Sequence, residues 1–316
     1  MSEEFKVRLE VAIEAAHLAS RYCEHIRQKS LYEDVTKQDG SPVTVADIGS
    51  QILISNCILK AFPDDLIVGE EDADFIELPF REEIDKFIAA NNIHLVHSYE
   101  RLLSKPVNQT ESRPFWTVDP IDGTKGFLKK SDGQYAVCIA YIDSDGRPDV
   151  AVVACPRLRD KGLIVSAIRG QRYIMAAELT SDTTELEFTR VVPKNVQDNK
   201  LMCCSAVSNH VDEQVLNDLM SKFDLTPLRL DSQVKYVLTA MGDAKVYVRC
   251  PPNGYREKIW DHASGDLLVH EAGGCVLDEN GQLLKYKLSG FLDCRMIISS
   301  LDCQLVLSML ELYVNQ

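Results

Sequence analysis

The most informative segment of this 316-residue chain is Phe115-Trp116-Thr117-Val118-Asp119-Pro120-Ile121-Asp122-Gly123-Thr124. Its first four residues predict a buried strand, which delivers Asp119 to its carboxyl end, where ligand sites of α/β proteins gather. A turn at the proline would return Asp122 to the same point and expose the Ile121 carbonyl. Two carboxylates and a carbonyl are the oxygen ligands that suit Mg²⁺ or Mn²⁺. A capped turn built from Asp and Gly is the alternative interpretation.

Three further acidic residues stand where a strand ends or a helix begins. Glu70 ends a short apolar strand, Asp47 follows a Pro-containing loop at a helix start, and Asp261 opens a helix. Taken singly, Asp47 and Asp261 could be helix N-caps, and Glu70 could belong to a solvated acidic surface. Together with the two aspartates of the central segment, their placement predicts a group of carboxylates around metal ions.

Hydrophobic periodicity predicts a layered α/β protein in two parts. The first part, residues 1–198, is predicted to be α+β and to carry most metal ligands. Its expected elements are helices over 3–29 and from Asp47 to before Pro63, a polar helical insertion, and strands over 66–69, 115–118, 135–142, 149–154, 162–168, 171–177 and 186–192. The second part, residues 199–316, alternates strand-like and helix-like segments over 200–205, 212–223, 232–241, 244–249, 259–272, 274–277, 295–299 and 301–314.

The charge balance limits the partners of the chain. It has 34 Lys and Arg against 48 Asp and Glu, a net charge of −14. A nucleic-acid polymer or an anionic membrane surface requires clustered positive charge, so neither is expected as a partner. The charged N-terminus does not fit a signal peptide, and no uncharged apolar run of membrane-spanning length exists. Ten cysteines without C-x-x-C spacing predict a reduced, cytoplasmic protein. A monomer is the favoured oligomeric state.

The motifs occur in an order that resembles the lithium-sensitive, Mg²⁺-dependent phosphatases of the inositol monophosphatase superfamily. The resemblance rests on residues 68–71 (VGEE), 119–124 (DPIDGT) and 260–263 (WDHA). Within that superfamily, four further stretches are similar to the 3′(2′),5′-bisphosphate nucleotidases, namely 37–47, 125–128, 230–236 and 257–263. The resemblance implies a layered αβαβα sandwich of the inositol monophosphatase/fructose-1,6-bisphosphatase type. It also implies release of the 3′-phosphate from 3′-phosphoadenosine 5′-phosphate, and from its sulfated analogue.

The resemblance further implies a role for each matching residue. Two or three Mg²⁺ ions, replaceable by Mn²⁺ and displaced by inhibitory Li⁺, would be held by Glu70, Asp119, Asp122, Asp261 and the Ile121 carbonyl. Asp47 and Thr124 would orient and deprotonate the attacking water, and Gly123 and Thr124 would contact the phosphate. The small-molecule nucleotide would be bound by Ser208, His210, Ser232, Lys235 and Arg249, with the two cations on its 5′-phosphate.

Two other functions fit parts of the same pattern. An inositol polyphosphate 1-phosphatase or an inositol monophosphatase would use the same metal chemistry on another substrate. A non-catalytic nucleotide-binding regulator would keep the fold without the need for a water-activating pair. The insertion at 73–114 contains no motif, and it would either shape the substrate entrance or cover the core.

Overall fold

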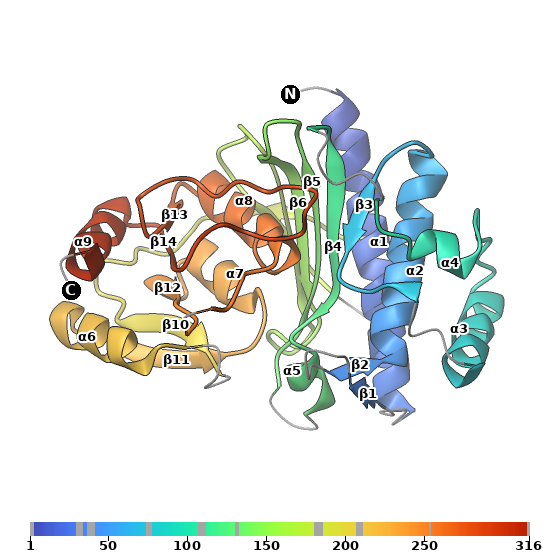
Figure 1. The fold of residues 1–316 in the computed structure, drawn as a ribbon, viewed down its shortest axis with the longest axis horizontal. Helices are drawn as coiled ribbons and strands as arrows, with labels where there is room; N and C mark the ends of the chain where they lie inside the picture. Colours follow the sequence, from blue (N-terminus) through green and yellow to red (C-terminus); the bar gives the residue numbers. More distant parts are fainter. Residues whose placement is uncertain are drawn as a thin grey trace.

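The protein forms five layers in a computed structural model that describes residues 3–29, 34–36, 42–73, 78–106, 112–129, 133–179, 186–206, 211–252 and 254–314 (Figure 1). The first layer contains α1 (Glu3–Gln28) and α2 (Val45–Ala61). The second is a seven-stranded sheet in the order β3 (Ile67–Gly69), β4 (Phe115–Asp122), β5 (Ala136–Ile142), β6 (Pro148–Cys155), β7 (Leu163–Ile168), β8 (Met175–Glu178) and β9 (Thr189–Arg190).

The third layer contains α7 (Val234–Ala240) and α8 (Ala263–Glu271), which pack between the two sheets. The fourth is a five-stranded sheet in the order β11 (Thr226–Leu230), β10 (Leu201–Ser205), β12 (Val246–Arg249), β14 (Ile297–Ser300) and β13 (Cys275–Asp278). The fifth contains α6 (Glu213–Phe223) and α9 (Cys303–Val314). This order of layers confirms the predicted αβαβα sandwich, and the division at residue 198 stays a prediction.

Strand direction determines where the two sheets offer ligand positions. In the five-stranded sheet, β10 is parallel to both β11 and β12, so the carboxyl ends of these three strands share one edge. In the seven-stranded sheet, β3 is parallel to β4, and the pairs from β4 to β9 are antiparallel. The parallel pairs therefore bring the residues that follow β3, β10, β11 and β12 to defined edges of their sheets.

Strand β4 continues further than the sequence predicts. It extends to Asp122 instead of ending at Val118, and its pairing with β5 shifts register between Asp119 and Asp122. Pro120 lies inside this irregular stretch, where a strand tolerates a residue without a backbone donor. A bulge in the strand, instead of a turn after it, thus carries both aspartates.

The predicted element boundaries were wrong at three other places. Strand β11 was not predicted, because its sequence, TPLRL, is partly exposed and contains Pro227. The strands expected over 171–177 and 186–192 shorten to β8 and β9, since the chain turns at Gly170 and Arg172, both with positive φ. A short hairpin of β1 (Asp34–Thr36) and β2 (Pro42–Thr44) precedes α2, and residues 37–41 of the expected hairpin lie outside the described part.

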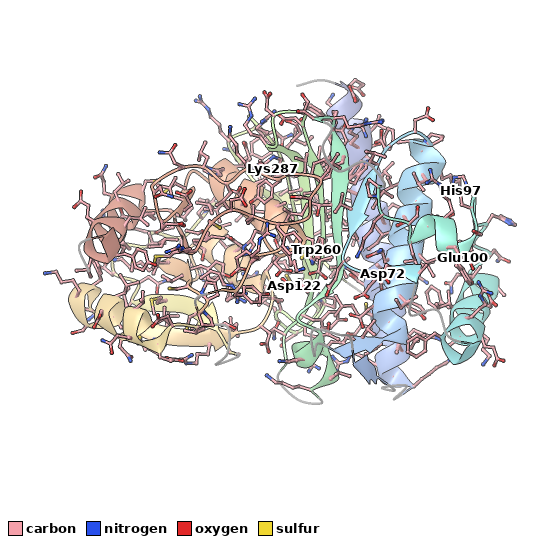
Figure 2. All side chains as sticks on the ribbon, in the orientation of Figure 1. Asp72, His97, Glu100, Asp122, Trp260 and Lys287 are labelled. Carbon is pink, nitrogen blue, oxygen red and sulfur yellow. The ribbon has the colours of Figure 1, made fainter. Side chains whose placement is uncertain are left out.

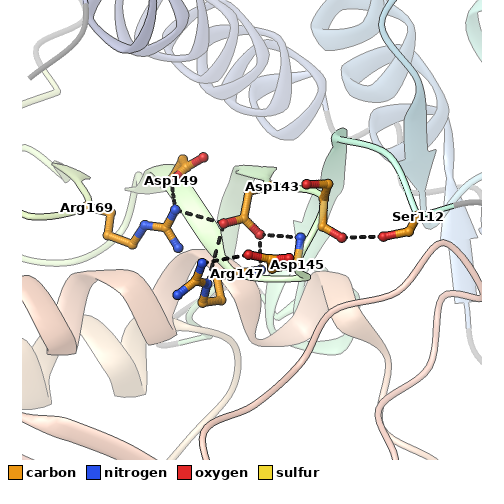
Figure 3. Close-up of polar contacts among 7 residues, drawn as sticks. Ser112, Asp143, Asp145, Arg147, Asp149 and Arg169 are labelled. Carbon is orange, nitrogen blue, oxygen red and sulfur yellow. Dashed lines mark hydrogen bonds and ion pairs between the residues drawn. The ribbon is translucent and has the colours of Figure 1, made fainter.

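The predicted hairpin turn after β5 is confirmed and is tied to the strand that follows β6 (Figure 3). The Asp143 carboxylate accepts hydrogen bonds from the backbone N–H groups of Asp145 and Arg147, at 2.9 and 2.8 Å. Arg169, just after β7, pairs with both Asp143 and the buried Asp149. These acids are neutralised by arginines, which distinguishes them from the acids near β4.

The insertion covers the outer side of α2. Its helices α3 (Leu78–Ala90) and α4 (Tyr99–Leu102) pack against α2, and His97 and Glu100 lie at the far edge of the molecule from Asp122 (Figure 2). Only near its end does it approach the candidate site, where Lys105 Nζ donates to the Glu70 carbonyl at 3.2 Å. In the described residues, its main contribution is therefore to the core.

Two further observations concern the described residues as a whole. None of the helices they form combines the length and apolarity that crossing a membrane requires. All ten cysteines lie among them, and all ten are free thiols.

Arg8 of α1 stabilises the contact between the first layer and the seven-stranded sheet. Its guanidinium carbon lies 3.9 Å from the ring centroid of Tyr141 and 4.3 Å from that of Phe62. It also pairs with Asp65, whose carboxylate accepts a 2.8 Å bond from the indole N–H of Trp116. The side chain of Arg8 is only 7% exposed, so its charge depends on these partners.

Replacement of Arg8 by Met is expected to lower the free energy of unfolding by about 3 kcal/mol, because Asp65 would lose its buried cation and two rings would lose theirs. Chemical denaturation measures this change. Lys6→Met is the control on the same helix, since Lys6 and its partner Glu3 are exposed and a solvent-screened pair adds little to stability. Equal stability of the two variants would contradict the prediction.

Candidate active site

Three acidic side chains meet where β4 faces the second part of the chain. Ligand oxygens of Asp119, Asp122 and Asp261 all lie within 4.8 Å of one another. The first two come from the bulge of β4, and Asp261 comes from the 3₁₀ helix η3 (Ile259–Asp261). Figure 2 shows Asp122 beside Trp260, between β4 and the layer of α7 and α8. The chain thus brings together three of the four carboxylates predicted as metal ligands.

The fourth carboxylate, Glu70, arrives from the neighbouring strand. Strand β3 pairs with β4 in parallel, and the Glu70 N–H continues the ladder by donating to the Val118 carbonyl at 3.1 Å. The Glu70 side chain forms a hydrogen bond with Asp119, which raises the pKa of the Asp119 carboxyl. Glu70 therefore faces the carboxylate cluster, which we define as Glu70, Asp119, Asp122 and Asp261.

The carboxylate cluster is electrostatically unfavourable without a cation. Burial, together with the charges of its neighbours, raises the pKa of Asp119 and Asp261 well above the usual range. Burial also raises the pKa of Asp122 to about 6, although Lys235 acts in the opposite direction. A divalent cation relieves such mutual repulsion, so these oxygens fit a hard metal ion.

Asp47 and Thr124, predicted to handle the attacking water, are in contact. The Thr124 hydroxyl donates to one carboxylate oxygen of Asp47 at 3.2 Å. The other oxygen accepts from the N–H and the hydroxyl of Thr44, at 2.7 and 2.6 Å. Asp47 is fully buried, so these donors compensate its charge.

The predicted position of Asp47 at the helix start requires correction. Helix α2 begins at Val45, and Thr44 is its N-cap, so Asp47 is the third helical residue and closes a capping box. Asp261 likewise does not open α8, which begins at Ala263, because Asp261 ends the separate helix η3. Neither aspartate is an N-cap, although Asp47 does contribute to the capping of α2 through the capping box.

The turn after β4 places the remaining predicted phosphate and metal ligands. The Ile121 carbonyl accepts a 3.3 Å hydrogen bond from the Thr124 hydroxyl, within reach of the carboxylate cluster. Gly123 has a φ of +89° and starts the short helix α5 (Thr124–Leu128). A Cβ at Gly123 would lie 3.2 Å from both the Gln134 carbonyl and Ser232 Cβ, so glycine suits both the conformation and the space.

The residues predicted to bind a nucleotide lie at the shared edge of the five-stranded sheet. Ser232 and Lys235 follow β11, and Arg249 ends β12. Lys235 Nζ donates to the carbonyls of Leu230 and Ser232 at 3.3 and 2.6 Å, and burial lowers the pKa of this amine. Arg249 is bound by Glu257 through two hydrogen bonds. Ser208 and His210 lie outside the described residues.

Gln233 connects the two parts of the site and was not predicted to have a role. Its backbone N–H donates to Asp122, and its side-chain amide donates to the Trp260 carbonyl at 2.7 Å. Its side-chain oxygen accepts from the Gly265 N–H at 2.7 Å. One glutamine thus fixes the loop of Asp261 relative to Asp122. The only sequence signal for this role is a long polar side chain at the start of a buried helix.

Comparison with known proteins identifies the family of the chain. The profile described as the Inositol monophosphatase family matches residues 1–306. The chain belongs to the inositol monophosphatase family. This confirms the resemblance drawn from the motifs of the sequence.

Curated relatives within this family are enzymes with one shared name. A Schizosaccharomyces pombe protein named 3′(2′),5′-bisphosphate nucleotidase is 34% identical, over 89% of this chain and 88% of the relative. A Dictyostelium discoideum protein of the same name is 33% identical, over 87% of each chain. The prediction that this chain is an enzyme is thereby confirmed.

Solved structures of the family have the same fold. CysQ from Bacteroides thetaiotaomicron superposes with a TM-score of 0.63 at 21% identity, over 94% of this chain and 97% of that one. The inositol monophosphatase from Anabaena (Nostoc) superposes with a TM-score of 0.62 at 17% identity, over 99% and 97%. At these sequence identities, the similarity concerns the fold alone.

The carboxylate cluster makes thermal stability depend on Mg²⁺ and on pH. The pKa of Asp122 is about 6 in the folded protein and about 4 in the unfolded chain, so its stabilising contribution is lost as the pH rises from 4 through 6. With a chelator present, we expect Tm to be lower at pH 7 than at pH 5. Saturating Mg²⁺ should raise Tm by roughly 5 °C at pH 7, and by less at pH 5, where protons compete.

Differential scanning fluorimetry at both pH values measures the effect. Asp145→Asn is the control, because Asp145 is 72% exposed in the turn after β5, far from any carboxylate cluster, and should respond to Mg²⁺ as the wild type does. An equal Mg²⁺ effect on Tm at the two pH values would contradict the expected competition with protons.

Proposed function

We propose that this enzyme is a Mg²⁺-dependent phosphomonoesterase that hydrolyses the 3′-phosphate of 3′-phosphoadenosine 5′-phosphate to give AMP and phosphate. The 5′-phosphosulfate analogue is proposed as a second substrate. The observation that carries the proposal is the pairing of a cation-binding feature, the carboxylate cluster at β4, with two buried cations that suit a phosphate, Lys235 of α7 and Arg249 of β12. The names of the curated relatives support the same substrate.

The carboxylate cluster, with the Ile121 carbonyl, would hold the metal. Its buried and mutually repelling acids fit a divalent cation, and Mn²⁺ is the expected substitute for Mg²⁺. Mg²⁺ bound there would supply a Lewis acid that lowers the pKa of water and stabilises the leaving oxygen.

The residues of the chain itself would then handle the proton. A water molecule that donates to the Thr124 hydroxyl can pass its proton to Asp47, because this hydroxyl already donates to Asp47. As the bond from water oxygen to phosphorus forms, the bond from phosphorus to the ribose O3′ breaks, and the water proton passes through Thr124 to Asp47. The ribose oxygen takes up a proton from solvent water as it leaves. No phosphoenzyme forms.

The second phosphate of the substrate would contact the cations at the edge of the five-stranded sheet. Lys235 and Arg249 influence Asp122 electrostatically, since both act to lower its pKa, so the two features are close enough for one small molecule. A cavity of about 620 Å³ lies near the end of β12 and is lined by Tyr255 and Arg256 among others, but neither of the two cations nor any member of the carboxylate cluster lines it.

The two alternative functions are less well supported. An inositol monophosphatase would need the carboxylate cluster and would leave the buried Lys235 and Arg249 without a second phosphate. An inositol bisphosphate does offer a second phosphate, and against it stand the names of the curated relatives. A non-catalytic regulator would have no use for the contact between Asp47 and Thr124. We also propose a cytoplasmic location, since ten free thiols suit a reducing compartment, and we favour a monomer that binds neither nucleic acid nor membrane.

Replacement of Asp119 or Asp122 by Asn should reduce Mg²⁺-dependent phosphate release to at most about 1% of wild type, because each change removes a charged metal ligand. Phosphate release is measured on 3′-phosphoadenosine 5′-phosphate, AMP, inositol 1-phosphate and inositol 1,4-bisphosphate. The Tm in chelator should not fall, since each change removes a repelling charge.

Two results of this panel would argue against the proposal. Full activity of either Asn variant would exclude the carboxylate cluster as the metal site. Turnover confined to the inositol esters would exclude the nucleotide substrate. Asp145→Asn again serves as the control for an acid exposed on the surface.

Lithium is expected to inhibit the enzyme at millimolar concentration by replacing one weakly held Mg²⁺. The measurement is the initial rate on 3′-phosphoadenosine 5′-phosphate at increasing LiCl, with NaCl at equal ionic strength as the control. A rate that depends only on ionic strength would show that no such exchange takes place.

A further inference from the structure

Four buried side chains form a continuous chain of hydrogen bonds beside the carboxylate cluster. Arg249 donates from Nε and Nη2 to the two oxygens of Glu257, at 2.7 and 3.1 Å. Nε2 of His262 lies 3.0 Å from Glu257, and Nδ1 of His262 lies 2.9 Å from the Tyr236 hydroxyl. Each of the four residues is less than a tenth exposed. None of the roles assigned so far involves Tyr236, Glu257 or His262.

This chain of hydrogen bonds is not a second metal site. Glu257 and His262, with Asp261, place ligand atoms within 4.8 Å of one another. However, both oxygens of Glu257 already accept from the Arg249 guanidinium, which would repel a cation. Burial opposes the charge of Glu257, yet Arg249 and His262 lower the pKa of its carboxyl to about 2. Glu257 is therefore the counter-ion of Arg249.

The two hydrogen bonds to Glu257 fix the orientation of the Arg249 guanidinium. Glu257 occupies the Nε–Nη2 edge of the guanidinium, so the Nη1–Nη2 edge is the one that can face an incoming phosphate. The guanidinium carbon also lies 5.5 Å from the ring centroid of Tyr255, which borders the 620 Å³ cavity. The position of this edge therefore depends on Glu257.

The other end of the chain reaches the second cation. Tyr236 follows Lys235 in α7, and its ring packs edge-on against Tyr247 of β12, 4.7 Å between centroids. Lys235 Nζ lies 5.4 Å from the same Tyr247 ring. The hydrogen bonds thus connect α7, which carries Lys235, to β12, which carries Arg249.

We propose that Glu257, held by His262 and Tyr236, is a positioning residue that fixes Arg249 for the distal phosphate and so makes the site prefer a nucleoside bisphosphate to a monophosphate. The proposal rests on the proposed function, because it concerns the second phosphate of the same substrate. The physical reason is preorganisation: a buried guanidinium that is already charged and oriented loses little freedom when the phosphate arrives.

The test compares two substrates that differ only in the 5′-phosphate, 3′-phosphoadenosine 5′-phosphate and adenosine 3′-monophosphate. With Glu257→Gln, we expect kcat/KM for the bisphosphate to fall about 30-fold, mainly through KM, because a buried charge pair is broken. For the monophosphate, which does not reach Arg249, the fall should be at most about three-fold. A purely structural defect would lower both values equally.

Tyr236→Phe provides a milder change if Glu257→Gln does not fold. It removes one neutral hydrogen bond and no packing, so the preference for the bisphosphate should fall about five-fold. Tyr286→Phe is the matched control, because Tyr286 is equally buried and its hydroxyl donates to Asp266 of α8 at 2.7 Å, outside this chain of hydrogen bonds. Its preference should equal that of the wild type.

The outcomes separate the two proposals. A wild-type enzyme that hydrolyses the bisphosphate, with preference lost in Glu257→Gln and Tyr236→Phe but kept in Tyr286→Phe, supports the positioning role. The positioning role alone is overturned if the wild-type enzyme hydrolyses the bisphosphate and Glu257→Gln keeps the wild-type preference. If Glu257→Gln does not fold, an unchanged preference in Tyr236→Phe has the same meaning. A wild-type enzyme without Mg²⁺-dependent bisphosphate turnover overturns the proposed function and this inference with it.

Discussion

The repulsion among the buried acids of the carboxylate cluster is the constraint on which the rest of the structure depends. Four carboxylates brought together in a buried site cannot be gathered by local sequence preferences, because burial and mutual repulsion oppose their charge, and burial with the neighbouring charges raises the pKa of Asp119 and Asp261. The chain holds them with rigid elements instead. A bulge in β4 supplies two, the parallel neighbour β3 supplies Glu70, and η3 supplies Asp261. Gln233 then ties η3 to β4, so the geometry persists before any cation binds.

The two sheets that face each other carry side chains of opposite charge. The seven-stranded sheet presents negative charge from β4, while Arg249 ends β12 of the five-stranded sheet and Lys235 lies in α7, which follows β11. In the proposed function, the 3′-phosphate of the substrate would bind at the carboxylate cluster and the 5′-phosphate would bind the two cations. In the proposed function, catalysis and selectivity would reside on different layers, and Tyr236 of α7 and His262, which precedes α8, would connect them.

Much of this arrangement could be predicted from the sequence, for identifiable reasons. Asp119 and Asp122 lie in a short motif after an apolar strand, and the long helices α1 and α2 have strong apolar patterns. The rest depends on tertiary contacts. Strand β11 forms because β10 offers it a parallel partner, and its own sequence favours no strand. The start of α2 is set by Thr44, whose hydroxyl reaches Asp47 only once the helix exists. Gln233 gains its role from Asp122, 111 residues away, which no local pattern encodes.

The shared helical layer has a consequence for how the molecule unfolds. One apolar core contains residues of both sheets, from Ala140 and Val153 on one side to Tyr247 and Ile297 on the other, with Leu268 of α8 between them. If either part separated, the other would expose one whole face of its sheet to water. The two parts are thus bound into a single cooperative unit, and loss of either dismantles the cation site, whose ligands come from both. For this chain, a complete set of candidate metal ligands therefore requires the globally folded state.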